Sequence, residues 1–183
     1  MGGIYKSEAG EQAVKARYGA ILDQWPSYLA YVVSFATVGA IWLGHAAITH
    51  HLEHADALLL RLNLLLLLLV SFVPFPTRLL AETVEHEEAG RVASTFYGLS
   101  LLAIATVVSV LWRHAARVHL VREDVADADV AAITARVTPG LAFYVVMIGI
   151  GIFVPVAAVL GYLAVAVFYL VPVGLMRRRA TGR

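Results

Sequence analysis

Long apolar runs separated by short polar segments set the pattern of this chain. Three runs cover residues 28–47, 62–81 and 92–112, and the second contains an unbroken row of leucines from Leu64 to Leu69. Each run has about the 20 residues that an α-helix needs to cross a hydrocarbon core of about 30 Å. Because backbone groups in lipid have to pair within their own segment, each run predicts a transmembrane helix.

A fourth apolar region, residues 140–176, carries no charge and is too long for one crossing. A straight helix of this length would reach about 55 Å, far more than a bilayer needs. Pro155 ends or kinks a helix where it stands. We therefore expect two crossings here, residues 140–154 and 157–176, and five crossings in the whole chain.

The two ends of the chain have a different character. Apolar and aromatic side chains near the N-terminus recur at helical spacing among charged residues: Val14, Tyr18, Ile21 and Trp25. This pattern is typical of an amphipathic helix on the membrane interface, over residues 1–25. Residues 177–183 form a basic tail, expected to be cytoplasmic. The predicted fold class is all-α, a polytopic membrane helical bundle over residues 26–176 with an N-terminal amphipathic helix.

Composition agrees with burial in lipid. Hydrophobic residues make up 60% of the chain and charged residues 15%, whereas soluble domains carry about 25% charged residues. The net charge of +1 gives no electrostatic reason to expect a nucleic-acid partner. The sequence has no cysteine, which excludes disulfides, thiol chemistry and cysteine-based metal sites. No cleavable signal peptide is visible, so we expect insertion through the hydrophobic segments themselves.

Charges between the apolar runs predict the orientation in the membrane. Basic residues dominate the segments after the first, third and last runs: Arg61, Arg113, Arg117, Arg122, Arg136, Arg177, Arg178, Arg179 and Arg183. The segment after the second run is acidic: Glu82, Glu85, Glu87 and Glu88. By the positive-inside rule, the basic segments face the cytoplasm and the acidic one faces outward.

Three of the polar residues inside the predicted crossings stand out, and polar groups at this depth need an explanation. Trp42 and His45 share one face near the cytoplasmic end of the first crossing, and Asn63 opens the second. Because consecutive crossings are antiparallel, the three lie at similar depth. One interpretation is ordinary hydrogen bonding between helices together with an interfacial tryptophan. The other is a polar network that positions a pore-lining helix.

The run His50-His51-Leu52-Glu53-His54 matches an H-x-x-E-H zinc motif. Catalytic zinc needs a third protein ligand and an open position within a shaped cavity, and the sequence offers no soluble domain to build one. The alternatives are adventitious metal binding, pH sensitivity and a solvated loop. We predict no metal site and no cofactor.

The acidic segment around Glu82 and Glu85 has two interpretations as well. The carboxylates would concentrate cations at the outer mouth of a pore, or they simply form a solvated loop. No nucleophile–base pair, P-loop or dinucleotide motif is present in the sequence, so we predict that the chain is not an enzyme.

Two stretches resemble a known family. Residues 25–35 with Ile41-Trp42-Leu43-Gly44-His45 resemble the second transmembrane helix of the transmembrane-protein-175 family, which comprises lysosomal potassium channels and bacterial relatives. Residues 61–82, with Asn63 and the run Pro74-Phe75-Pro76-Thr77, resemble the third helix. The resemblance implies passive potassium permeation by a homo-oligomer in the cell membrane, with potassium ions and lipid as partners.

One family feature is not found in the sequence. In the family, the first helix lines the ion path and carries an Arg-x-x-x-Phe-Ser-Asp signature, and these 183 residues contain none. Trp42, His45 and Asn63 match family positions that hold this arginine and aspartate. We therefore expect a channel-family member without its pore helix, conducting little by itself. The alternatives are a non-conducting assembly protein or degenerate relative, and a membrane metalloprotein at His50 and His54.

Overall fold

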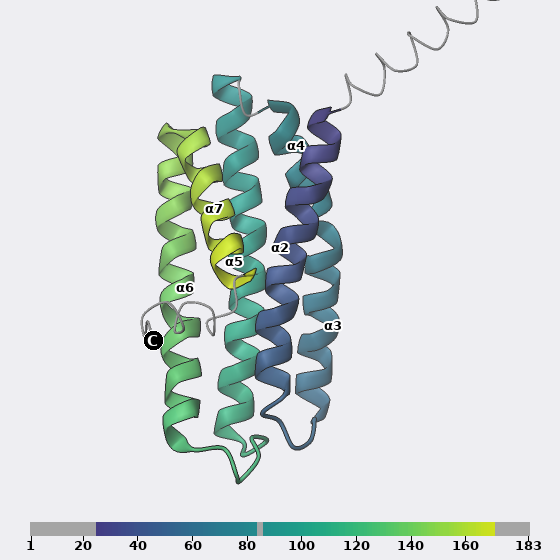
Figure 1. The fold of residues 1–183 in the computed structure, drawn as a ribbon, viewed down its shortest axis with the longest axis vertical. Helices are drawn as coiled ribbons and strands as arrows, with labels where there is room; N and C mark the ends of the chain where they lie inside the picture. Colours follow the sequence, from purple (N-terminus) through teal and green to yellow (C-terminus); the bar gives the residue numbers. More distant parts are fainter. Residues whose placement is uncertain (1–24, 84–85, 171–183) are drawn as a thin grey trace, which may run out of the picture.

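The computed structural model describes residues 25–83 and 86–170, and every regular element in these residues is an α-helix (Figure 1). The predicted all-α class is confirmed. The predicted interfacial segment lies outside the described residues except for Trp25. Residues 171–176 of the last predicted crossing and the basic tail also lie outside them.

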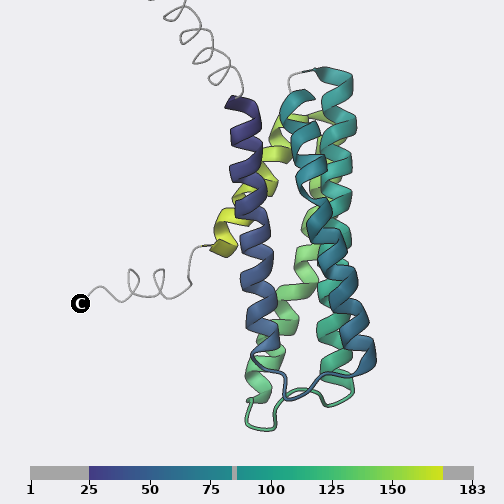
Figure 2. The ribbon, with the colours of Figure 1, turned by 90° about the vertical axis from the view of Figure 1, so that its right-hand side faces the viewer.

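The helices form an elongated antiparallel bundle (Figures 1 and 2). They are α2 (Trp25–Thr49), α3 (Ala57–Phe72), α4 (Pro74–Thr83), α5 (Glu87–Arg117), α6 (Asp127–Phe153) and α7 (Pro155–Leu170). Four stretches are long and apolar enough to cross a membrane: Tyr31–Thr49, Ala57–Thr83, Glu87–Arg117 and Ile133–Phe153. The shorter apolar helix α7 occupies the place of the fifth predicted crossing.

Local chemistry explains where the helices begin and end. Asp56 caps α3, because its side chain accepts a hydrogen bond from the Leu59 backbone N–H at 2.8 Å. Pro74 and Pro155 stand at the first positions of α4 and α7, where a missing N–H costs nothing. The segment Ala57–Thr83 therefore crosses as two helices that meet at Val73, and the chain turns back at Val154.

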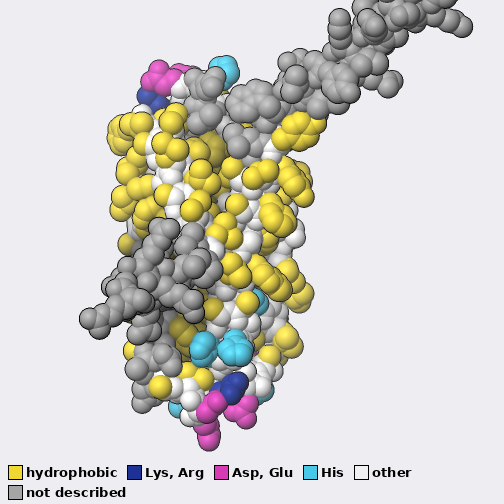
Figure 3. Space-filling view, in the orientation of Figure 1, with side chains coloured by type: hydrophobic (Ala, Val, Ile, Leu, Met, Phe, Trp, Pro, Cys, Tyr) yellow, Lys and Arg dark blue, Asp and Glu magenta, His cyan; other side chains and the backbone are white. Residues whose placement is uncertain are grey.

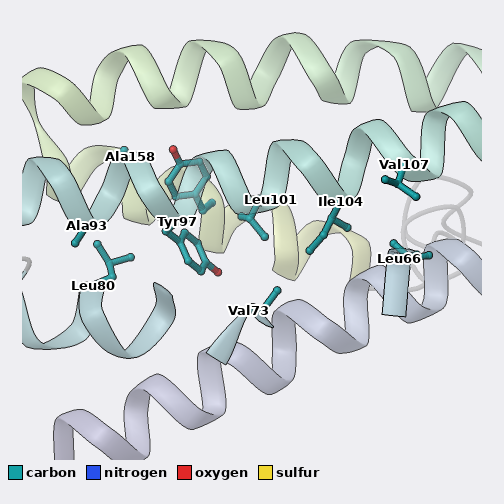
Figure 4. Close-up of a cluster of buried hydrophobic side chains, with 10 residues drawn as sticks. Leu66, Val73, Leu80, Ala93, Tyr97, Leu101, Ile104, Val107 and Ala158 are labelled. Atoms are coloured by element: carbon teal, nitrogen blue, oxygen red, sulfur yellow. The ribbon is translucent and has the colours of Figure 1, made fainter. Parts of the chain in front are cut away.

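Helix α5 is the centre of the bundle and packs against α3, α4, α6 and α7. Its buried side chains Tyr97, Leu101, Ile104 and Val107 follow helical spacing. They meet Leu66, Val73 and Leu80 from α3 and α4, and Ala158 from α7 (Figure 4). This core packs α3, α4 and α7 against α5.

Helix α7 approaches α5 closely at one glycine. A Cβ added to Gly98 would lie 2.1 Å from the Tyr162 hydroxyl oxygen. The Tyr162 ring packs edge-on against Tyr97, with centroids 5.4 Å apart. Tyr97 also shares a buried hydrogen bond of 3.1 Å with Thr37 of α2. Tyr97 therefore links α5 to both α2 and α7.

The outer surface is apolar along most of its length. Large hydrophobic side chains such as Phe35, Leu64, Leu68 and Val92 are more than half exposed. On the face shown in Figure 3, the acidic and basic side chains gather at the two ends of the bundle. A surface of this kind suits the hydrocarbon of a bilayer with charged ends in water.

Candidate functional site

A polar pair connects α2 to α3 within the membrane-spanning region. The carbonyl oxygen of the Asn63 side chain accepts a hydrogen bond from Nε2 of His45 at 2.7 Å. His45 lies one turn before the end of α2, and Asn63 lies in the second turn of α3. Both side chains are half-buried. The structure therefore brings together two of the three polar residues that the sequence analysis selected.

Trp42 joins the pair through its ring rather than through a hydrogen bond. Its indole lies 6.0 Å from the His45 ring, centroid to centroid, at an interplanar angle of 34°. The Trp42 side chain is 62% exposed. Among the described residues, no acceptor meets its indole N–H. We name Trp42, His45 and Asn63 the polar triad.

The polar triad lies at the edge of the bundle rather than in its core. Helix α2 packs mainly on α4 and α7, whereas α3 packs on α5. Figure 2 shows α2 and α3 separating above the loop that connects them. The contact between His45 and Asn63 therefore bridges two helices that have little other packing with each other, and Trp42 beside it is exposed.

Of the two residues that the sequence suggested for an outer mouth, the described one, Glu82, lies at the opposite end of the molecule from the polar triad. Glu82 is in the last turn of α4 and accepts a hydrogen bond from Arg78 at 2.7 Å. In the first turn of α5, Glu87 pairs with Arg91 at 2.6 Å. Both ion pairs are exposed, so water and salt screen them and each adds little to stability. Glu85 lies outside the described residues.

The histidine motif does not form a helical zinc site. Helix α2 ends at Thr49, so His50 and His54 lie in the following loop and not one turn apart on a helix, as the motif requires. His51 instead bonds the Ala47 carbonyl at 2.6 Å. Within residues 25–83 and 86–170, no three histidine or acidic side chains gather in a way that would hold a metal ion.

A second contact, which the sequence did not predict, joins the start of α3 to the end of α5. One carboxylate oxygen of Asp56 accepts the Leu59 N–H, and the other accepts a hydrogen bond from Nε2 of His114 at 2.7 Å. We name the Asp56–His114 contact the basal clasp. The local sequence could indicate only the helix-capping role of Asp56, because this residue immediately precedes an apolar helix. His114 is far away in sequence.

The two loops beside the basal clasp are also joined. The backbone N–H of Glu53 donates to the Leu120 carbonyl at 2.9 Å, and that of Arg122 donates to the His51 carbonyl at 3.0 Å. His119 turns the chain here with a φ of 56°. An open hollow of about 610 Å³ lies beside this bridge. Its open, polar walls fit a solvated surface rather than an enclosed ligand site.

These contacts favour the charged form of Asp56. The Leu59 N–H and then the His114 side chain hold the pKa of the Asp56 carboxyl below its ordinary value. The stabilisation from a depressed carboxyl pKa is present above the ordinary value of 3.8 and is lost as pH falls through the lowered pKa. Asp56 therefore stays ionised at neutral pH, and the basal clasp keeps a charged acceptor.

An antiparallel bundle of apolar helices, with charged ends and a polar triad at its edge, defines a multi-pass membrane protein. A family model described as "Endosomal/lysosomal potassium channel TMEM175" matches residues 5–74. A crystal structure of a lysosomal potassium-selective channel TMEM175 homolog from Chamaesiphon minutus superimposes with a TM-score of 0.72 at 35% identity, covering 87% of this chain and 81% of that one. The chain belongs to the TMEM175 family.

Two curated relatives support this membership. A potassium channel of Chamaesiphon minutus is 43% identical over 128 residues, and one of Streptomyces collinus is 39% identical over 115 residues. These alignments cover 69% and 63% of this chain, but only 63% and 56% of the respective relatives. The family is one of potassium channels and not a class of enzymes.

Proposed function

We propose that this chain forms the helical frame of an oligomeric potassium channel in the cell membrane. In this proposal the polar triad holds a pore-lining helix against α2 and α3. The function is passive permeation of potassium, favoured over sodium. The observation that carries the proposal is the half-buried His45–Asn63 pair with its exposed Trp42 neighbour. Polar groups at this depth are costly in lipid and are satisfied by a further helix that presents polar partners.

The described helices are poor candidates for lining the pore themselves. An ion path needs polar or charged groups, or a hydrophobic constriction that opens by wetting. The outward-facing side chains of α2 and α3 are largely apolar, including Val32, Phe35, Leu64 and Leu68. We infer that the lining comes from a helix bearing the Arg-x-x-x-Phe-Ser-Asp signature, which these 183 residues do not contain.

The acidic outer end has a secondary place in this proposal. Glu82 and Glu85 would raise the local cation concentration at the outer mouth. Since Arg78 already neutralises much of the charge of Glu82, we expect this contribution to be small and sensitive to ionic strength.

Potassium flux into liposomes tests the proposal. We expect the 183-residue chain to give little flux, and the same chain with a signature-bearing helix fused before Trp25 to give potassium-selective flux. In the fused chain, His45→Ala should reduce flux, because it leaves buried polar groups of the added helix unpaired. Leu64→Ala, at an exposed position beside Asn63, is the matched control and should change little.

Two outcomes would contradict the proposal. Robust potassium-selective flux from the unmodified 183 residues would show that another helix lines the pore. A correctly inserted fused chain without flux would favour the alternative, a non-conducting membrane protein that only assembles with partners.

A further inference from the structure

Asp56 of the basal clasp is the N-cap of α3, the helix that also carries Asn63 of the polar triad. Asp56 and Asn63 are seven residues apart, close to two turns of α3, so they lie on nearly the same side of it. A hydrogen bond of 2.7 Å joins Asp56 to His114 in the last turn of α5. The clasp thus fixes the start of α3 to the central helix of the bundle.

Helix α3 needs such a fixed point. It packs chiefly on α5 and has little packing against α2. Near its start, Leu59 is buried against Leu111 and Ala115 of α5, but apolar contacts between leucine and alanine tolerate small rotations and shifts. A hydrogen bond to a carboxylate is directional. The position of Asn63 relative to His45 therefore depends on the directional contact two turns below it.

We propose that Asp56 and His114 are positioning residues, whose contact fixes the depth and rotation of α3 and so holds Asn63 opposite His45. This inference deepens the proposed function, because it names the residues that keep the polar triad assembled. Its test is a distance and not a current, so it succeeds or fails independently of whether the chain conducts.

The absence of cysteine from the sequence makes the distance measurable with spin labels. Labels at Leu43→Cys on α2 and Leu64→Cys on α3 lie beside the triad, at positions that are 49% and 67% exposed. A second pair, Val92→Cys on α5 and Val145→Cys on α6, serves as the control because both positions are exposed and the two helices pack closely.

Three variants separate the clasp from the helix cap. Asp56→Ser keeps a good N-cap residue but is too short to reach His114. His114→Leu keeps the size of the side chain and removes the donor, whereas His114→Gln keeps an N–H donor on a chain of similar length. We expect Asp56→Ser and His114→Leu to shift and widen the 43–64 distance distribution. His114→Gln should restore the wild-type distribution.

The control pair should stay unchanged in all three variants. An unchanged 43–64 distribution in both Asp56→Ser and His114→Leu would overturn the proposal. So would a His114→Gln distribution as wide as that of His114→Leu, since a donor at this position would then have no effect. Widening of the 92–145 pair together with the 43–64 pair in Asp56→Ser would also overturn it, because the contact would then support the whole fold and not α3 in particular.

Discussion

The missing side chain of Gly98 decides how closely α7 packs on α5. A Cβ at this position would lie 2.1 Å from the Tyr162 hydroxyl oxygen and 2.6 Å from Ile148 Cγ1. The Tyr162 hydroxyl is buried and has no hydrogen-bond partner among the described residues. Removing the Tyr162 hydroxyl therefore breaks no hydrogen bond. A methyl group added to Gly98 instead forces α5 and α7 apart.

We expect Gly98→Ala to lower the free energy of unfolding by about 1–3 kcal/mol, the usual cost of overpacking a core. Tyr162→Phe alone should be nearly neutral, and the double variant should recover part of the loss because the closest contact is gone. Thermal unfolding in detergent micelles measures these differences. Gly44→Ala, with nothing within 4 Å of the added Cβ, is the matched control. Equal stability of Gly98→Ala and Gly44→Ala would contradict the prediction.

The end of α2 determines what the histidine-rich segment can do. The motif His50 to His54 would present two ligands on one face only if the helix continued through it. The helix stops at Thr49, and the chain then pairs with the loop after α5 through the Leu52–Val121 bridge. This tertiary pairing competes with helix continuation, and it could not be read from the local pattern.

We therefore expect substoichiometric zinc in protein purified without added metal, because the loop supplies neither helical spacing nor a third ligand. Elemental analysis checks this. The His50→Ala/His54→Ala variant is the control and should contain the same trace amount as the wild type. One zinc per chain in the wild type, lost in the double variant, would revive the metalloprotein alternative.

Among the described residues, arginines are more numerous at one end of the molecule than at the other. Arg113, Arg117 and Arg122 lie at the end that holds the basal clasp, together with the acidic Glu53, Glu123 and Asp124, whereas Arg78 and Arg91 lie at the α4–α5 end with Glu82 and Glu87. By the positive-inside rule we expect the end with the basal clasp to face the cytoplasm. The polar triad, near the same end of α2, then lies in the cytoplasmic half of the membrane.

We expect Glu85→Cys to react with a membrane-impermeant thiol reagent in intact cells, because the positive-inside rule predicts that this acidic segment faces outward. Val118→Cys, an uncharged and exposed position at the other end of α5, should react only after lysis, and a tag after Arg183 should be cytoplasmic. The reverse labelling pattern would show that the orientation is inverted.

The sequence predicts some parts of this structure and leaves others undetermined. Hydropathy is a property of consecutive residues, so the long apolar runs predicted helices in the described part of the chain, and Pro155 stands at the start of α7 as its chemistry suggests. The similar depth of His45 and Asn63 also followed from the sequence, because antiparallel helices of known length align their ends.

Only the tertiary structure decided which helix faces meet. The hydrogen bond between Asp56 and His114, the close approach of Tyr162 to Gly98, and the end of α2 at Thr49 all depend on helix rotation and on neighbours far away in sequence. In apolar helices such as α3, the hydropathy pattern leaves rotation nearly undetermined, because every face is hydrophobic. Sequence therefore determined which segments are long and apolar enough to cross a membrane, and packing around α5 determined how their few polar groups meet.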